Sequence, residues 1–178
     1  RSRGIYVTGS DLGIYPPMST ALAKWGIPVF QGFSSTNLAL DPSPDVVVIG
    51  NAVRSDNLEV KAAQDRNLEI YSFPDALYEF AMRDKCRVVV AGTHGKTTTT
   101  SMLGTILRES GLEPSIFVGG ISNNLGSSFV EGEGEHFVVE GDEYDTAFFD
   151  KTPKFLHYHP SVLVITSVEF DHADIYYD

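Results

Sequence analysis

Short runs of β-branched residues alternate along the chain with longer stretches in which apolar residues recur at helical spacing. The runs predict strands at Ile5–Thr8, Val46–Ile49, Arg87–Ala91, Ile116–Val118, Phe137–Glu140 and Val162–Thr166. The longer stretches predict helices at Met18–Trp25, Asn57–Arg66, Pro74–Asp84 and Lys96–Glu109. Several strands are apolar at consecutive positions, as expected where helices cover both faces of a sheet. The alternation as a whole predicts an α/β protein with a parallel sheet.

Local signals support two of the helices. Ser72 and Asp75 have the spacing of a capping box at the start of the third helix. Gly111 stands just past the end of the fourth helix, where a glycine commonly terminates a helix. The apolar residues predicted to share one face of that fourth helix are Met102, Leu103, Ile106 and Leu107.

A charged junction at Arg83–Lys85, just before a new strand, is the most plausible domain boundary. It predicts one domain at residues 1–84 and a second at residues 85–178. A doubly wound domain usually opens with a strand and a glycine-rich turn, and the chain begins after the place where those would lie. We therefore expect the chain to lack residues at its start, and at its end as well.

Composition narrows the possible partners. The chain has 178 residues, of which 42% are hydrophobic, so it can bury a core. Its formal net charge of −11 would repel nucleic-acid backbones and anionic membranes, so neither is an expected partner and no protein partner is inferred. No apolar run approaches the length of a membrane span. The single cysteine, Cys86, excludes an intrachain disulfide and suits the cytoplasm.

The most informative chemical motif follows the apolar run Val88–Val90. The standard phosphate-loop pattern has four residues between its first glycine and the glycine-lysine pair. Here Gly92 and Gly95 are separated by only two residues. The physical requirements are still met, because a buried strand leads into a tight turn whose amides open a helix. The sequence predicts a shortened phosphate loop, and the alternative is a helix that merely begins with Gly-Lys-Thr.

Each part of the loop has a predicted task. Lys96, the predicted catalytic residue, would contact the β- and γ-phosphates of a nucleotide as a mobile positive charge. The Thr97 hydroxyl would face the magnesium ion that bridges those phosphates. Gly92 and Gly95 would let the backbone close around the anion. The complete set of predicted nucleotide contacts is Gly92, Thr93, His94, Gly95, Lys96, Thr97 and Thr98.

Four separated motifs together resemble one known family. They are the loop Gly92–Thr99, the turn Tyr15–Thr20, the acidic segment Glu140–Lys151 and the segment Glu169–Ile175. These resemble the Mur ligases, ATP-dependent enzymes that form the amide bonds of bacterial cell-wall peptides. The resemblance extends over essentially the whole chain. It implies a UDP-sugar-binding Rossmann-like domain at residues 1–84, part of the phosphate-loop-containing central ATPase domain at 85–178, and an absent C-terminal domain.

The turn and the acidic segment are similar to one branch of the family. That branch joins the tripeptide L-alanyl-γ-D-glutamyl-meso-diaminopimelate to UDP-N-acetylmuramate during peptidoglycan recycling. The implied reaction uses ATP and Mg²⁺ to convert a carboxylate to an acyl phosphate, which the tripeptide's amine attacks. A chain without the amine-binding domain is expected to be inactive by itself. The alternatives are the branch that adds L-alanine, a nucleotide-binding module without catalysis, and an interaction domain.

The resemblance also implies metal ligands. Glu140 ends a predicted strand, and ligands bind at the C-terminal edge of parallel sheets. Glu140 is implied, with Thr97, to bind one magnesium ion, and His172 aligns with the ligand of a second. The neighbouring carboxylates are interpreted as surface groups or as outer support of the site: Glu131, Glu133, Glu135, Asp142, Glu143 and Asp145.

Candidate contacts to the nucleotide-sugar lie after other strands. Ser10 and Asp11 follow the first predicted strand, and Gly50 and Asn51 follow the second. Asn124 is implied to contact the muramoyl group. Gly, Asn, Asp and Ser dominate turns in any protein, so ordinary turn chemistry is the alternative. The chain also departs from the family, with Gly141 where alanine is usual and Ser167 where asparagine is frequent.

Overall fold

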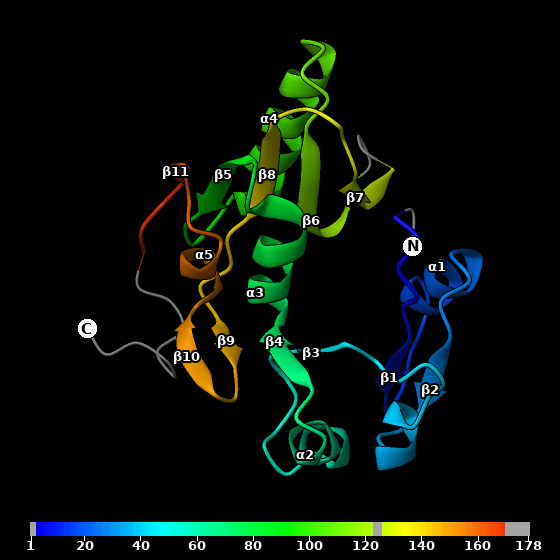
Figure 1. Cartoon of the computed structure of the whole chain (residues 1–178). Helices are drawn as coiled ribbons and strands as arrows, with labels where there is room; N and C mark the ends of the chain where they lie inside the picture. Colours follow the sequence, from blue (N-terminus) through cyan, green and yellow to red (C-terminus); the bar gives the residue numbers. More distant parts are fainter. Residues whose placement is uncertain (1–2, 123–125, 170–178) are drawn as a thin grey trace. The chain divides into compact units, whose positions relative to one another are not determined.

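The computed structural model of the chain describes residues 3–122 and 126–169. Its contacts divide the chain into two compact units, which are described separately (Figure 1). The first unit contains the residues up to Ile49 together with Val53–Ile70, and the second contains Gly50–Ala52 and the residues from Tyr71 onward. No helix among the described residues is long and apolar enough to span a membrane.

The first unit is a small α/β arrangement. Strand β1 (Gly9–Asp11) pairs in parallel with β2 (Val29–Gln31), and helix α1 (Met18–Lys24) connects them. The 3-10 helix η1 (Ser35–Leu38), strand β3 (Val46–Ile49) and helix α2 (Leu58–Asp65) follow. Strand β3 pairs with β4 (Glu69–Ser72). The buried apolar side chains of this unit are Ile49, Val60, Ala62 and Ala63.

The predicted first strand at Ile5–Thr8 is wrong, because regular pairing begins only at Gly9. Gly9 lies opposite Val29 in the parallel ladder, so a longer strand would place Thr8 opposite Pro28. Proline has no N–H to donate and therefore ends a ladder. The apolar residues of the predicted strand are accordingly exposed, with Ile5 at 57%.

A five-stranded sheet forms the centre of the second unit, in the order β11-β5-β8-β6-β7. Its strands are β5 (Cys86–Ala91), β6 (Ser115–Ser122), β7 (Ser127–Val130), β8 (His136–Glu140) and β11 (Val162–Ile165). Strands β11, β5, β8 and β6 are parallel, and β7 is antiparallel to β6. The predicted α/β class with a parallel sheet is therefore confirmed.

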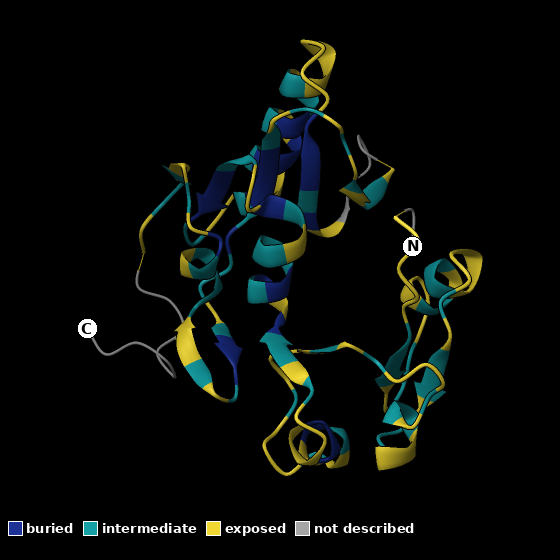
Figure 2. Ribbon diagram, viewed as in Figure 1, coloured by how far each residue is buried: buried dark blue, intermediate teal, exposed yellow. Residues whose placement is uncertain are grey.

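Both faces of this sheet are covered, which explains the consecutive apolar residues of its strands (Figure 2). Helix α4 (Lys96–Glu109) packs against β5, β6 and β8 on one face. A core on the other face contains Met82, Val89, Phe137, Val139 and Tyr158. Alternate residues of one strand therefore enter different cores, because successive side chains point to opposite faces.

Helix α4 has the predicted bounds, but its most buried residues are not those of its apolar stripe. Met102 and Ile106 are 56% and 57% exposed, whereas the buried residues of the helix are Thr100, Ser101 and Gly104. A Cβ atom on Gly104 would lie 2.6 Å from the Cδ1 atom of Ile116 in β6. Small residues thus let the helix approach the sheet closely, and this approach selects the buried face.

The remaining predicted helix, Pro74–Asp84, is present as two joined segments. Helix α3 (Phe73–Leu77) continues into the π-helical turn η2 (Tyr78–Met82). The capping interaction is confirmed, because the Ser72 hydroxyl accepts a hydrogen bond from the backbone N–H of Asp75 at 3.2 Å.

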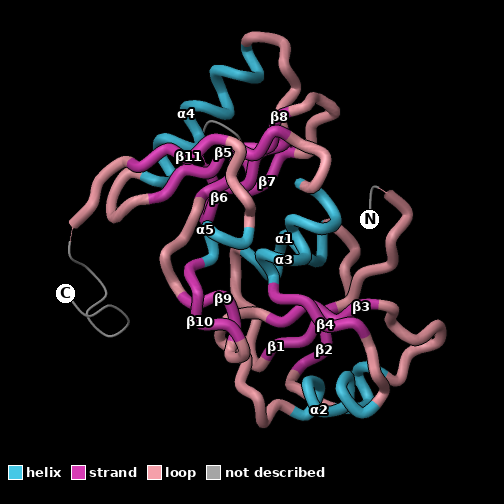
Figure 3. The backbone as a smooth tube through the Cα atoms, turned by 60° about the vertical axis from the view of Figure 1, so that its left-hand side comes forward, coloured by secondary structure: helices cyan, strands magenta, loops and turns pink. Residues whose placement is uncertain are grey.

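One part of the second unit was not predicted from the sequence. Strands β9 (Asp145–Ala147) and β10 (Asp150–Pro153) form an antiparallel pair after β8, and helix α5 (Lys154–His157) follows (Figure 3). His157 connects this region to α3, because its Nδ1 atom lies 2.8 Å from Asp75 Oδ1. Its Nε2 atom lies 2.7 Å from Thr152 Oγ1 in β10.

Candidate active site

The predicted phosphate loop lies at the C-terminal edge of the parallel sheet of the second unit. Strand β5 ends at Ala91, which pairs with Ile165 of β11, and Val90 pairs with Glu140 of β8. The ends of three strands from distant parts of the sequence therefore meet at one edge. Ligands bind at this edge in parallel α/β folds.

The backbone of the loop depends on its two glycines. Gly92 has a φ angle of +122° and Gly95 a φ angle of +81°, both in the region that favours glycine. Gly95 is also the N-cap of α4 and supplies no side-chain cap. The first N–H groups of a helix have no partner within the helix, so this N-terminus presents amide donors and a partial positive charge to an anion.

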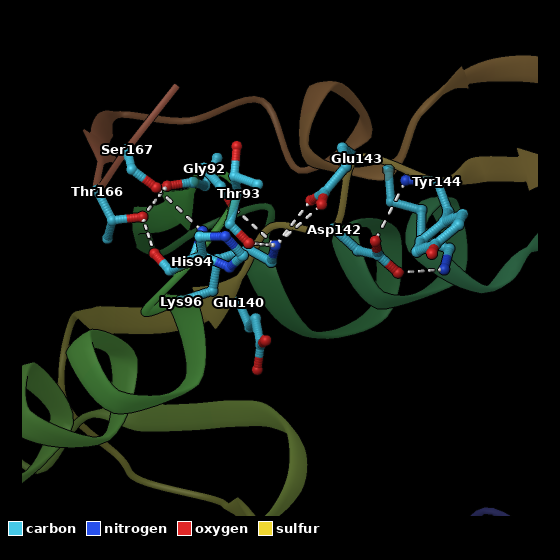
Figure 4. Close-up of polar contacts among 12 residues, drawn as sticks. Gly92, Thr93, His94, Lys96, Glu140, Asp142, Glu143, Tyr144, Thr166 and Ser167 are labelled. Carbon is cyan, nitrogen blue, oxygen red and sulfur yellow. Dashed lines mark hydrogen bonds and ion pairs between the residues drawn. The ribbon is translucent and has the colours of Figure 1, made fainter. Parts of the chain in front are cut away.

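The residues directly after β11, Thr166 and Ser167, hold the loop in place and are called the strap here. The backbone N–H of Thr93 donates to the carbonyl oxygen of Ser167 at 3.0 Å, and that of His94 donates to the Ser167 hydroxyl at 3.0 Å. The Thr166 hydroxyl donates to the carbonyl oxygen of His94 at 2.5 Å (Figure 4). The His94 side chain is 70% exposed, and its Nε2 atom lies 3.7 Å from Glu169 Oε2. Ser167, which departs from the family pattern, thus has a defined role in the loop's geometry.

Lys96 begins α4 and points back across the loop. Its Nζ atom lies 2.6 Å from the carbonyl oxygen of Gly92 and 3.2 Å from that of Thr93. It also lies 3.0 Å and 2.9 Å from the two carboxylate oxygens of Glu143, which follows β8 (Figure 4). The Lys96 and Glu143 side chains are only 14% and 20% exposed. The positive charge of Lys96 is therefore compensated by a neighbouring carboxylate.

Thr97 and Glu140 form a pair of oxygen donors beside Lys96. The Thr97 hydroxyl donates to Glu140 Oε1 at 2.8 Å, while Glu140 Oε2 accepts a hydrogen bond from the N–H of Gly119 at 2.8 Å. Hydroxyl and carboxylate oxygens are suitable ligands for Mg²⁺, which usually keeps several waters and binds substrate phosphates as well. The pair therefore fits such an ion. The described residues contain no group of three or more His, Cys, Asp or Glu side chains arranged to hold a metal.

A buried tyrosine lies beneath the acidic segment. Tyr158 is 2% exposed. Burial raises the pKa of its hydroxyl well above the usual value, and the negative charges of Asp142 and Glu140 raise that pKa further. The hydroxyl therefore stays neutral and adds no third negative charge near these carboxylates.

The acidic segment is less solvated than its sequence suggests. Lys154 lies 2.7 Å from Asp142, and Lys151 lies 2.7 Å from Asp145. Glu143 pairs with Lys96, so it is a residue of the site that the sequence interpretation left among surface or supporting carboxylates. The sequence signal that could have drawn attention to Glu143 is its place three residues after Glu140, past the end of β8.

The predicted nucleotide-sugar contacts lie in both units. In the first unit, the Ser10 hydroxyl donates to Glu59 Oε2 at 2.5 Å, and Asp11 Oδ1 accepts the N–H of Gly13 at 2.9 Å. Gly50 and Asn51 are exposed and belong to the second unit. Their roles stay predictions. Two further predicted site residues, Asn124 and His172, lie outside the described residues.

The strand, loop and helix together define an α/β protein of the phosphate-loop class. A model described as "Mur ligase family, catalytic domain" matches residues 1–85, and one described as "Mur ligase middle domain" matches residues 90–178. The chain belongs to the Mur ligase family. The predicted resemblance is confirmed, whereas the predicted boundary after residue 84 stays a prediction.

Individual relatives place the chain more narrowly. It is 48% identical to the UDP-N-acetylmuramate–L-alanyl-gamma-D-glutamyl-meso-2,6-diaminoheptandioate ligase of Escherichia coli strain K12, over 100% of this chain and 38% of that protein. It is 43% identical to the UDP-N-acetylmuramate–L-alanine ligase of Myxococcus xanthus, over 98% of this chain and 34% of that protein. The chain thus spans well under half the length of these relatives.

A solved structure agrees with the fold. The crystal structure of the UDP-N-acetylmuramate:L-alanyl-gamma-D-glutamyl-meso-diaminopimelate ligase from Neisseria meningitides has a TM-score of 0.91 and 42% sequence identity to this chain. The match covers 99% of this chain and 57% of that chain.

Proposed function

We propose that the intact protein is an ATP-dependent ligase that joins the tripeptide L-alanyl-γ-D-glutamyl-meso-diaminopimelate to UDP-N-acetylmuramate. The γ-phosphate of ATP is transferred to the lactyl carboxylate, giving an acyl phosphate and ADP. The amine of the tripeptide then attacks the acyl carbon, and inorganic phosphate leaves as the amide bond forms. The product would be a cell-wall precursor rebuilt from recovered peptide, so the enzyme would act in the cytoplasm.

The observation that carries this proposal is the arrangement around Lys96. A glycine-bracketed turn, the open N-terminus of α4 and an ammonium group are brought together at the edge of a parallel sheet. Phosphoryl transfer depends mainly on the position of the phosphates and on the neutralisation of their charge. Lys96 would contact the β- and γ-phosphates, and the amides at the N-terminus of α4 would bind their oxygens.

Thr97 and Glu140 would hold the magnesium ion that accompanies ATP. When bound, such an ion neutralises the charge that develops on the phosphates. The two residues are already joined by a hydrogen bond of 2.8 Å, which orients the carboxylate next to the N-terminus of α4. We propose His172 as the ligand of a second magnesium ion.

The tripeptide is proposed as the amine substrate because of the relatives. The ligase from Escherichia coli named for the tripeptide is 48% identical over the whole chain, against 43% for the L-alanine ligase of Myxococcus xanthus. For UDP-N-acetylmuramate we propose contacts from Ser10, Asp11, Gly50, Asn51 and Asn124. Residues 1–84 would form the UDP-sugar domain and residues 85–178 part of the ATPase domain.

The test is ADP release by the purified intact protein, measured with each substrate omitted in turn. We expect release to require both UDP-N-acetylmuramate and the tripeptide, and the Lys96→Ala variant to be inactive while its circular dichroism matches the wild type. Turnover with free L-alanine in place of the tripeptide would assign the protein to the L-alanine branch. ADP release that ignores UDP-N-acetylmuramate would instead indicate a nucleotide-binding module without ligase activity.

A further inference from the structure

The hydrogen-bonding capacity of Lys96 is already used. An ammonium group has three N–H donors. The carbonyl oxygens of Gly92 and Thr93 lie 2.6 Å and 3.2 Å from the Nζ atom, and the Glu143 carboxylate oxygens lie 2.9 Å and 3.0 Å from it (Figure 4). Lys96 can therefore contact a phosphate only by giving up one of these partners.

Glu143 is the partner that a phosphate would replace. The two carbonyl groups belong to the loop that carries Lys96 itself, whereas Glu143 comes from the segment after β8. A carboxylate and a phosphate carry the same sign, and the low exposure of both side chains limits screening of their repulsion by solvent. A phosphate at Lys96 is thus incompatible with Glu143 in its present position.

We infer that Glu143 is the resident counter-ion of Lys96, which occupies the place of a nucleotide phosphate and leaves when the nucleotide binds. This assignment rests on the proposed function, because it requires the loop to bind a nucleotide. Without nucleotide, Glu143 keeps Lys96 oriented and removes the cost of leaving its charge uncompensated. Glu143 thereby lowers the affinity for the phosphate part of the nucleotide.

The neighbours of Glu143 keep their own partners, so the Glu143 side chain can leave Lys96 without displacing the rest of the segment. Asp142 on one side pairs with Lys154 of α5, and Asp145 on the other side pairs with Lys151 of β10. Each of these carboxylates has its own lysine at 2.7 Å, so neither needs Lys96. The segment stays anchored at both points while the Glu143 side chain turns away.

The test compares dissociation constants of the intact protein for ADP, measured by calorimetry with magnesium present. Glu143→Gln keeps the shape of the side chain but removes its charge. Two ligands that compete for one cation are coupled unfavourably, and a coupling of this kind typically changes affinity by about 5-fold or more. We therefore expect Glu143→Gln to bind ADP about 5- to 10-fold more tightly than the wild type. Adenosine, which has no phosphate, should bind both proteins equally.

Asp142→Asn is the matched control, because it removes one negative charge from the adjacent residue without contact to Lys96. It should change the affinity for ADP far less than Glu143→Gln does. Glu143→Asp keeps the charge but shortens the side chain, so its affinity should lie between those of the wild type and Glu143→Gln. Thermal unfolding of each variant confirms that it is folded.

Two outcomes would count against the inference in different ways. If the wild type binds ADP and Glu143→Gln binds it equally or more weakly, the counter-ion assignment is wrong and the proposed function stands. If neither the wild type nor any variant binds ADP, the proposed function fails and the inference fails with it. Binding of ADP by Glu143→Gln but not by the wild type would support both.

Discussion

Replacing Gly92 with alanine tests whether the loop geometry is as constrained as the structure indicates. The φ angle of Gly92 is +122°, where residues with a Cβ atom are rarely found. The new Cβ atom would lie 2.5 Å from Thr166 Oγ1, 2.7 Å from the carbonyl oxygen of Ser167 and 2.9 Å from the Ser167 nitrogen. Two of these three atoms belong to the backbone of the strap, so rotation of a side chain cannot relieve the crowding.

The expected loss of stability follows from two terms. A residue held in a disfavoured backbone conformation costs about 1–3 kcal/mol. Overpacking of a filled site costs about 1–3 kcal/mol more. Gly92→Ala should therefore lower the free energy of unfolding by roughly 2–6 kcal/mol, a large part of the usual total. Detachment of the strap from Thr93 and His94 would reduce this loss and would also weaken nucleotide binding.

Two other glycines distinguish the cost of the disfavoured backbone conformation from the cost of overpacking. Gly111 has a φ angle of +76° but no atom within 4 Å of a Cβ, so Gly111→Ala should cost only about 1 kcal/mol. Gly120 has open space and no positive φ angle, so Gly120→Ala should change stability by less than about 0.5 kcal/mol. Urea unfolding followed by circular dichroism measures all three variants. Equal stability of Gly92→Ala and Gly120→Ala would refute the reasoning.

Three further predictions concern residues near the site. Gly141→Ala should lower the free energy of unfolding in urea by about 1–3 kcal/mol, because the new Cβ atom would lie 2.7 Å from Val89 Cγ1 and 2.8 Å from Phe155 Cβ. An unchanged free energy of unfolding would contradict this close packing. Thr97→Val should weaken ADP binding by about tenfold when magnesium is present but leave ADP binding without magnesium unchanged, as measured by calorimetry. Equal losses of affinity with and without magnesium would argue against Thr97 as a magnesium ligand. Hydrogen bonds from Thr152 lower the pKa of Asp150 below its ordinary value of 3.8. The ionised carboxylate therefore stabilises the fold above pH 3.8, and this stabilisation is lost as the pH falls through the lowered pKa. Asp150→Asn should thus be less stable at neutral pH and lose less stability than the wild type on acidification, as measured by Tm between neutral pH and about pH 3; parallel curves would contradict the shift.

The strands and helices of the second unit were largely predictable from local chemistry. Helix α4 has the bounds that its glycine and apolar pattern indicate, and Ser72 caps α3 as its spacing with Asp75 suggests. Such features depend on residues three or four positions apart, whose geometry is set within one turn of helix. The Ile5–Thr8 prediction failed because a strand also needs a partner, and Pro28 ends the ladder there.

The contacts of the candidate site were harder to predict from the sequence than the strands and helices. The pair of Lys96 and Glu143 joins residues 47 positions apart, and an acidic run is usually a solvated surface. The apolar stripe of α4 also does not mark its buried residues, because Gly104 approaches Ile116 closely and the small residues face the sheet. Both results depend on which segments the sheet brings together.

The glycine-bracketed turn, the lysine and threonine after it, and the carboxylate at the end of β8 identify a phosphate loop and its family from the sequence. That identification relies on residue types at short spacings, and short spacings fix local geometry. The tertiary structure decided which partners these groups have. The order β11-β5-β8 sets the strap at Ser167 and the carboxylate of Glu143 on either side of the loop, because parallel strands end at the same edge of the sheet.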